Sequence, residues 1–344
     1  MRPLFFLALL LSSQVGAVEI LTTVKPLQLI ANAITEGGKP AGLLLKPGTS
    51  PHDYSLKPSD LRRIKNADLV IWVGPELEGF LTPLLGNSNN GLALMAQMPA
   101  SAHDHHEGSD HDDHQKHDHH DGHAAHEHHD HDSHDAHEHR DHDGHEAHED
   151  HHGHDKVEIA DDSAEDEHDH GGRDPHIWLD PHHALHIARL IVERLGELDP
   201  ANLDRYQANL VRFESTLADT DKRVAERLAP AQDKGYFVFH DAYGYWEDHY
   251  DIPSLGHFTI NPERAPGAQT VTRIHQALLD ASAECVFAEP QFRPAVVNAV
   301  VRGTQARVAV LDPLASDIEA GPDGYFDFML KLSENMAVCL LNER

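Results

Sequence analysis

The sequence is poor in cysteine, in positive charge and in long apolar runs. Its 344 residues include two Cys, and 27 Lys and Arg stand against 58 Asp and Glu, which gives a formal net charge of −31 at pH 7. Nucleic acids present a phosphate backbone that binds to basic surfaces. The charge balance therefore argues against nucleic acid as a partner.

Signatures of the common enzyme classes are also missing from the sequence. It contains no Gly-rich phosphate loop and no nucleophile elbow. An H-E-x-x-H match at 148–152 lies in a tract rich in His, Asp and Glu, where such a match is expected by chance. The protease motif works only on a folded helix, so we do not interpret this match as a catalytic site.

The one long apolar run lies at the N-terminus. Arg2 precedes the apolar residues 4–11, and small residues follow up to Ala17. This layout predicts a cleavable signal over 1–17, and the run is shorter than the about 20 residues of a membrane span. The alternative is a buried N-terminal helix. Because no Cys stands at the expected cleavage point, we expect no lipid anchor but a soluble periplasmic protein that does not span the membrane.

Cys285 and Cys339 are the only two cysteines. An even pair in an exported protein is more often bridged than free. We therefore expect one disulfide that ties the C-terminal segment to a strand, with two buried thiols as the alternative. A bridged sulfur offers no thiolate, so neither residue is expected to bind a metal.

Histidine is concentrated in one segment. Residues 103–170 hold 24 of the 33 His and 25 of the 58 acidic residues, with almost no large apolar side chain. Such a segment cannot bury enough surface to offset the entropy cost of ordering it. We interpret it as a disordered surface insert within the first domain, and the rest of the chain as an ordinary, mildly acidic globular protein.

Outside the insert, apolar runs and helical periodicities alternate. The pattern predicts an α/β fold with two doubly wound (βα)n domains, at 18–198 and 230–344. The expected strands are 19–24, 42–45, 68–73, 236–239, 285–288 and 308–311. The expected helices are 26–36, one that starts at Pro58, 181–195, 242–250, 269–281, 296–306 and 325–341.

A long helical pattern occupies 199–229. Apolar residues recur at helical spacing from Leu203 to Val224, and neither Gly nor Pro interrupts the run. About thirty helical residues would span roughly 45 Å. We predict one rigid connecting helix between the domains, with two packed helices as the alternative.

Candidate metal ligands follow the predicted strands. In open α/β sheets, ligands bind beyond the carboxyl ends of the strands. His52 follows the run at 43–46, His176 lies in an Asp-Pro-His turn, and His240 and Asp312 come directly after strands. Three His with one oxygen ligand suit a tetrahedral zinc site in an interdomain cleft. The alternatives are solvated or packed histidines, and an Asp312 that caps a turn before Pro313.

Other histidines outside the insert give weaker signals. His182, His183 and His186 follow Asp180 on a predicted helix, at spacings that allow coordination. We interpret them as surface or capping residues, and we assign no site to His249 or His275.

Several long motifs together resemble a known family. The sequence resembles the metal-specific solute-binding proteins of ABC importers, and within them the zinc-uptake (ZnuA-type) branch. The resemblance covers essentially all of residues 18–341, and the segments that carry it are 51–60, 174–181, 236–243, 256–259, 261–263, 266–269 and 285–292.

The resemblance implies two α/β domains joined by one long helix, with the metal between them. It maps His52, His176 and His240 onto the three zinc-binding histidines of the family and Asp312 onto an acidic fourth ligand. Some zinc proteins carry Glu just before the first His, where this chain has Pro51. The fourth ligand is therefore expected to be Asp312 or water.

Further features of the family concern metal choice and accessory sites. Manganese members favour a carboxylate at one of the positions of His176 and His240, so histidine at both favours zinc. His257 resembles a residue of an auxiliary metal site, although packing would explain it equally. A His-rich insert is typical of the zinc branch, and Cys285 and Cys339 match a disulfide of some members.

These features predict a periplasmic zinc-binding subunit that delivers Zn²⁺ to a membrane permease, driven by a cytoplasmic ATPase. Neutral imidazoles bind metal, so affinity should fall below about pH 6.5. A monomer is expected. The insert would concentrate or sense zinc through its histidines, including His103, His105, His106, His117, His119 and His120.

Four alternatives remain open. The chain would otherwise be a stand-alone zinc buffer or chaperone, an importer subunit for manganese or another divalent metal, an adhesin or a metalloenzyme. The last is disfavoured, because a site filled by protein ligands lacks the open position that catalysis needs.

Overall fold

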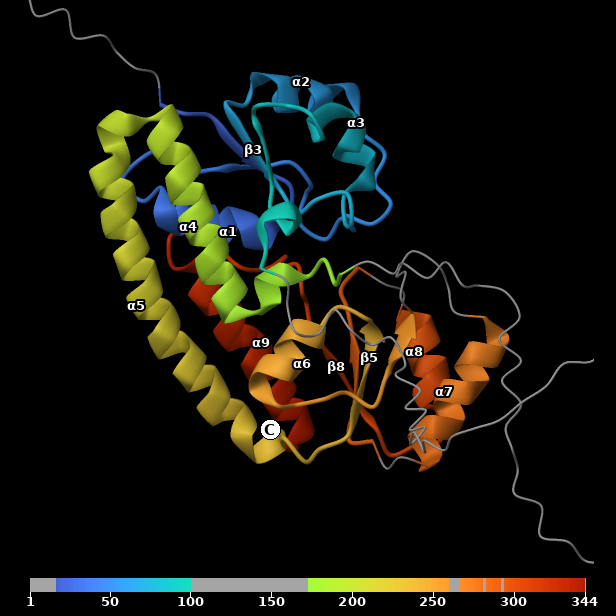
Figure 1. Cartoon of the computed structure of the whole chain (residues 1–344). Coiled ribbons are helices and arrows are strands. Elements are labelled where there is room, and N and C mark those ends of the chain that lie inside the picture. Colours follow the sequence, from blue (N-terminus) through green and yellow to red (C-terminus); the bar gives the residue numbers. More distant parts are fainter. Residues whose placement is uncertain (1–16, 100–172, 260–266, 281–282, 292–293, 344) are drawn as a thin grey trace, which may run out of the picture. The chain divides into compact units, whose positions relative to one another are not determined.

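The computed structural model describes residues 17–99, 173–259, 267–280, 283–291 and 294–343 (Figure 1). The predicted signal up to residue 16 lies outside these residues, as do the insert at 103–170 and the match at 148–152. The candidate loop ligands His103, His105, His106, His117, His119 and His120 lie outside them too. Among the helices of the described ranges, none is both long enough and apolar enough to cross a membrane.

Four parallel strands form the N-terminal sheet in the order β2-β1-β3-β4. The central strand β3 is buried on both faces, as expected for a parallel sheet covered by helices. The strands are β1 (Ile20–Thr22), β2 (Gly42–Leu43), β3 (Leu69–Trp72) and β4 (Gly91–Ala93), and the helices are α1 (Lys25–Ile34), α2 (Pro58–Asn66) and α3 (Thr82–Leu85).

The C-terminal sheet repeats this arrangement in the order β6-β5-β7-β8, again with parallel strands. Its strands are β5 (Tyr236–His240), β6 (His257–Thr259), β7 (Cys285–Ala288) and β8 (Arg307–Val310). Its helices are α6 (Gly244–Tyr250), α7 (Ala268–Asp280), α8 (Pro294–Val301) and α9 (Gly324–Leu340). The predicted α/β class is confirmed, whereas the three-residue strands β4 and β6 were not predicted.

Two long helices lie between the sheets in sequence, α4 (Pro181–Leu198) and α5 (Leu203–Leu228). The α5 helix is continuous over 26 residues, so the alternative of two packed helices is wrong. It spans about 39 Å rather than 45 Å, because a 3-10 turn at Pro200–Asn202 replaces the first expected turn. It packs along α4, α9 and α1 (Figure 1). Both sheets belong to one compact unit with these helices, so the domain boundaries at 198 and 230 stay predictions.

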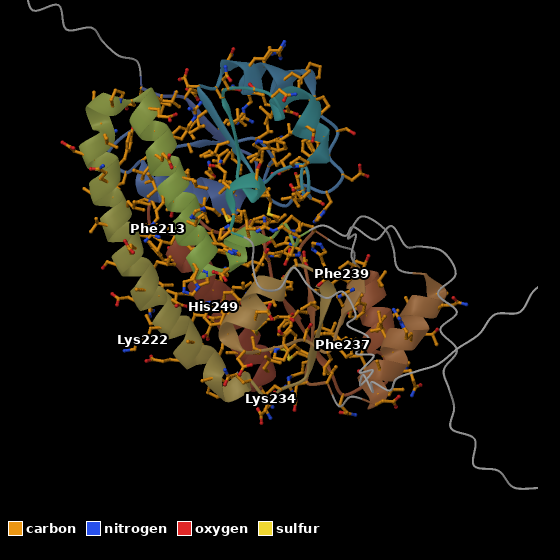
Figure 2. All side chains as sticks on the ribbon, viewed as in Figure 1. Phe213, Lys222, Lys234, Phe237, Phe239 and His249 are labelled. Atoms are coloured by element: carbon orange, nitrogen blue, oxygen red, sulfur yellow. A yellow bond between two sulfur atoms is a disulfide. The ribbon has the colours of Figure 1, made fainter. Side chains whose placement is uncertain are left out.

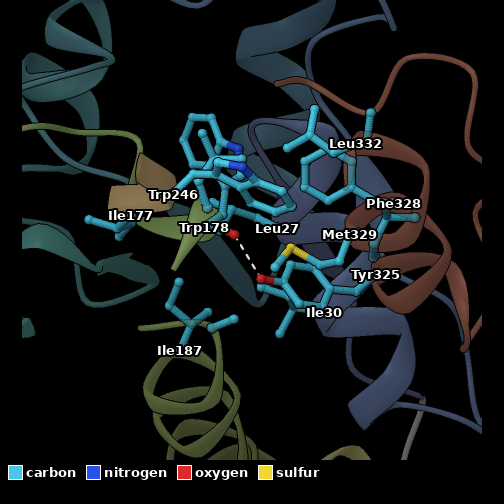
Figure 3. Packing of buried hydrophobic residues seen from close by; sticks show 14 of the residues in the cluster. Leu27, Ile30, Ile177, Trp178, Ile187, Trp246, Tyr325, Phe328, Met329 and Leu332 are labelled. Atoms are coloured by element: carbon cyan, nitrogen blue, oxygen red, sulfur yellow. Dashed lines mark hydrogen bonds between the residues drawn. The ribbon is translucent and has the colours of Figure 1, made fainter. Parts of the chain in front are cut away.

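Trp178 anchors the segment that precedes α4 (Figure 3). Its side chain is fully buried, and its indole N–H donates to the carbonyl oxygen of Pro313 at 2.8 Å. The hydroxyl of Tyr325 on α9 donates to the carbonyl oxygen of Trp178, also at 2.8 Å. Two hydrogen bonds and the surrounding apolar side chains thus fix the backbone two residues beyond His176.

The two cysteines form one disulfide, as predicted, and the alternative of two buried thiols is wrong. Cys285 on β7 and Cys339 on α9 have Cα atoms 6.2 Å apart and are separated by 54 residues. Closing a loop of this length lowers the entropy of the unfolded chain and corresponds to about 4 kcal/mol of stability. The bridge fixes α9 to the C-terminal sheet.

A buried carboxyl group lies at the carboxyl edge of the N-terminal sheet. Glu78 has no exposed surface, and it accepts hydrogen bonds from the Thr23 hydroxyl and, at 3.1 Å, from the Gly74 N–H. Burial raises the pKa of Glu78 from 4.5 to about 7, although both hydrogen bonds act in the opposite direction.

We predict that Glu78→Gln makes stability less dependent on pH. A folded-state pKa above the unfolded value favours folding below about pH 4.5, and this contribution is lost as pH rises through 7. The difference between the two pKa values corresponds to about 3 kcal/mol. Urea unfolding should therefore show the Gln variant as more stable than the parent at pH 8, by up to that amount, and similar to it near pH 4.5.

The matched control is Glu193→Gln, because Glu193 is exposed on helix α4 and does not contribute to the shifted pKa of Glu78. This variant should keep the pH dependence of the parent. Parallel stability curves for the parent and Glu78→Gln would contradict the assignment of a buried, neutral carboxyl group.

Candidate metal site

The C-terminal sheet has a crevice where its strand order reverses, between β5 and β7. His240 is the last residue of β5, rather than the first residue after it as the sequence predicted. Glu289 directly follows β7. Side chains alternate along β5, and Phe237 and Phe239 pack into the cluster that contains α7 residues (Figure 2). Alternation therefore directs His240 to the opposite face of the sheet.

Three imidazoles from separate segments converge beside this crevice. His52 lies in the loop 44–57 between β2 and α2, and His176 directly precedes the 3-10 turn Ile177–Leu179. One ring nitrogen from each of His52, His176 and His240 lies within 4.8 Å of the others. The ring centroids are 5.6 Å apart for His52 and His176, and 5.0 Å apart for each of the other two pairs.

The histidines line a small and largely apolar cavity. Its volume is about 10 Å³, the room that one water molecule or one ion needs. His176 and His240 are each 3% exposed, whereas His52 is half-buried and marks the side nearer to solvent. The lining residues are Ser50, Pro51, His52, His176, His240, Glu289, Gln291, Pro313 and Leu314.

Carboxyl groups lie behind two of the three rings. Nδ1 of His176 is 2.7 Å from Oδ1 of Asp174, which also accepts the backbone N–H of His176 at 2.9 Å. Nδ1 of His240 is 3.5 Å from Oε1 of Glu289. A partner at Nδ1 orients the ring and leaves Nε2 for a metal ion. Asp174 and Glu289 were not predicted as site residues from the sequence, although Glu289 directly follows a strand, the position that pointed to His240.

Burial favours the uncharged forms of His240 and Glu289, which line the cavity side by side. Burial lowers the pKa of His240 well below its ordinary value, and the nearby rings of His176 and His52 lower it further. Burial also raises the pKa of Glu289 well above its ordinary value, and Asp312 adds to this effect. A neutral imidazole is the form that binds a metal.

Asp312 is not a member of the three-histidine group. Its Oδ1 accepts hydrogen bonds from the Gln291 amide at 2.9 Å and from the Leu314 N–H at 3.1 Å, and its Oδ2 accepts the Ser316 N–H at 2.6 Å. The carboxylate therefore caps the turn after β8 and orients Gln291 at the cavity wall. A direct role as metal ligand stays a prediction.

His257 lies outside this group as well. It is on β6 beside β5, and its Nδ1 is 3.5 Å from Oδ1 of Asp241. Its side chain is 37% exposed, and its auxiliary metal role stays a prediction.

The sequence matches known proteins over nearly its whole length. A family model described as zinc-uptake complex component A, periplasmic (ZnuA), matches residues 20–339. The high-affinity zinc uptake system protein ZnuA of Yersinia pestis is 43% identical over 342 residues, which cover 97% of this chain and 95% of that protein.

Solved structures share the fold. A crystal structure of ZnuA has a TM-score of 0.65 at 20% identity and covers 94% of this chain and 100% of its own. The laminin-binding protein of Streptococcus agalactiae, described as an adhesin with metal transporting activity, has a TM-score of 0.67 at 18% identity with the same coverage. These likenesses support the fold alone. The match over residues 20–339 and the 43% identity show that this chain belongs to the periplasmic zinc-uptake component A (ZnuA) family.

Proposed function

We propose that the protein captures Zn²⁺ in the periplasm through His52, His176 and His240, and delivers it to the permease of an ABC importer. The observation that carries this proposal is the convergence of three imidazoles on a cavity of about 10 Å³. Family membership supports transport rather than catalysis, so we expect no enzymatic activity. In this proposal Zn²⁺ is the cargo of the protein, and a cytoplasmic ATPase drives its import.

The donor set favours zinc over manganese. Imidazole nitrogens suit Zn²⁺, whereas Mn²⁺ prefers carboxylate, carbonyl and water oxygens. We propose that water completes the tetrahedral shell, because the oxygens of Asp312 already accept three hydrogen bonds. A shift of Asp312 toward the metal would leave the Leu314 and Ser316 N–H groups without these acceptors.

Release of the metal requires one ligand to withdraw. His176 directly precedes a segment anchored through Trp178, and His240 ends a strand that is paired on both sides. His52 instead lies in the loop 44–57, which is neither helix nor strand, and it is half-buried. We therefore infer that metal enters and leaves on the His52 side, with a small movement of this loop.

Two further parts of the proposal concern the remaining segments of the chain. We propose that residues 1–17 are removed on export, and that the His-rich insert at 103–170 concentrates or senses zinc. The described residues on either side of it lie close together, because the guanidinium group of Arg173 donates to the carbonyl oxygens of Met95 at 3.3 Å and Pro99 at 2.7 Å.

Substitution of any one ligand should weaken tight zinc binding. We expect His52→Ala, His176→Ala and His240→Ala each to raise the dissociation constant more than about 100-fold, since changes behind a ligand alone cost 10- to 100-fold. Competition with a chromogenic chelator measures the dissociation constant of this tight site. The control is His275→Ala, because Nδ1 of His275 donates to the Val300 carbonyl on another part of the fold. Unchanged tight binding in all three variants would refute the site.

Removal of a carboxylate behind a ligand should have a smaller effect. Asp174→Ala deletes the partner of His176 Nδ1 and should weaken zinc binding about 10- to 100-fold, because the ring loses its fixed orientation. The same chelator competition measures the change. Asp317→Ala is the control, since Asp317 forms a surface ion pair with Lys331 and does not line the three-histidine cavity. Equal affinities of the two variants would show that Asp174 does not position the ring.

Deletion of the insert distinguishes between two functions, that of an importer subunit and that of a zinc buffer. A chain in which a short linker replaces residues 103–170 should keep one tightly bound zinc per molecule, because Arg173 already holds the described flanking residues Met95 and Pro99 close by. Metal analysis after dialysis against a weak chelator counts the retained zinc. A buffer would lose its zinc with the insert. The deletion variant that also carries His240→Ala gives the background zinc content of a chain without the tight site.

A further inference from the structure

A second group of metal-ligating side chains lies at the junction of three helices. One ligand atom from each of Asp180, His182 and His249 lies within 4.8 Å of the others. Nδ1 of His182 is 3.6 Å from Oδ1 of Asp180, and the rings of His182 and His249 have centroids 4.9 Å apart. Asp180 and His182 belong to the start of α4, whereas His249 lies near the end of α6.

The long helix α5 supplies a fourth side chain. Oδ1 of Asp221 lies 2.9 Å from Nε2 of His249 and also accepts the Tyr250 hydroxyl at 2.9 Å. Figure 2 shows His249 on the side of α6 that faces α5. A carboxylate paired with an imidazole fixes the orientation of the ring, as it does behind the ligands of metal sites.

Helix capping accounts for only part of this arrangement. Asp180 is the N-cap of α4, and its Oδ1 accepts the backbone N–H groups of His182 and His183. That role requires no particular side chain at position 182. The imidazole of His182 is nevertheless 78% exposed and lies against the ring of His249, which is itself 14% exposed. Two imidazoles and a carboxylate at this separation match the donors of a zinc-type site.

We propose that Asp180, His182 and His249, with Asp221 supporting His249, form a second site for a divalent cation of the zinc type. The site binds more weakly than the three-histidine cavity for two reasons. The exposed His182 side chain loses rotamer freedom on binding, and the positive end of the α4 dipole opposes a cation. Water fills the open positions, so the bound ion exchanges readily.

The second site is separate from the first but lies on the same segments. None of its residues lines the three-histidine cavity. His176 lies four residues before Asp180, and His240 lies four residues before the start of α6. A cation at the second site would link α4 to α6, which are the helices that follow two of the proposed cargo ligands.

Footprinting of His182 tests the proposal on the full chain. Diethyl pyrocarbonate modifies imidazoles that are not coordinated, and mass spectrometry of peptides reads each position separately. Free Zn²⁺ is set with a metal buffer, so that zinc bound elsewhere on the chain does not matter. We expect Zn²⁺ to protect His182 from modification in a single transition. The midpoint of this transition should lie at a higher free zinc concentration than the midpoint of binding to the three-histidine site.

Substitutions assign the protection to this cluster. His249→Gln and Asp180→Asn should each move the midpoint to at least about tenfold higher free zinc. Asn also caps helices well, so Asp180→Asn keeps the start of α4 folded. The control His186→Gln, one turn further along α4, should leave the midpoint unchanged.

Two outcomes would overturn the proposal. In the first, His182 stays reactive at every zinc concentration. In the second, the midpoint of its protection is the same in the parent, His249→Gln and Asp180→Asn. Either result would mean that the two rings only stack. His52→Ala should leave the protection of His182 unchanged, so failure of the second site is distinguishable from failure of the cargo site.

Discussion

The burial of imidazoles is the constraint on which the rest of the site depends. His176 and His240 are almost fully buried, and burial lowers the pKa of His240 well below its ordinary value, which favours the neutral ring that binds a metal. Carboxyl oxygens lie at Nδ1 of both rings, at 2.7 Å from Asp174 for His176 and at 3.5 Å from Glu289 for His240. The structure also holds the backbone next to His176 through Trp178, so this ring is oriented before any metal arrives. Preorganisation of this kind favours tight binding, because little ordering remains to be done.

Long helices and a disulfide form the frame around the cavity. Helix α5 runs unbroken beside α4 and α9, and the disulfide fixes α9 to β7. Two of the three histidines belong to this frame, and only His52 lies in a loop. A protein that carries cargo must also release it, and a buried ion leaves only when a ligand moves. In the proposed site, two histidines on or beside regular elements and one histidine in a loop would meet both requirements within one fold.

Periodicity in the sequence predicted most of the fold, and its failures have physical causes. Helix α5 and the buried strands β3, β5 and β7 are long or apolar enough to stand out, whereas β4 and β6 have three residues each and no clear alternation. The rule that ligands follow strands found His240, but it does not reveal whether a carboxylate has other partners. Asp312 illustrates this limit, because its oxygens accept N–H groups that a sequence does not place. The contact between the rings of His182 and His249 was not predicted, because the two residues meet only through tertiary packing.

The two sheets have corresponding crevices, which different side chains occupy. Each has its strand order reversed at one point, and each therefore offers a ligand position at its carboxyl edge. In the N-terminal sheet, Glu78 occupies this position and bonds to Thr23 and Gly74, which follow β1 and β3. In the C-terminal sheet, His240 and Glu289 occupy it and face the cavity. A carboxyl group that bonds within its own sheet fills the first crevice, whereas an imidazole, the donor that suits zinc-type metals, lies at the second. The choice of side chain at one edge, rather than the topology, therefore distinguishes the proposed metal site from the N-terminal crevice.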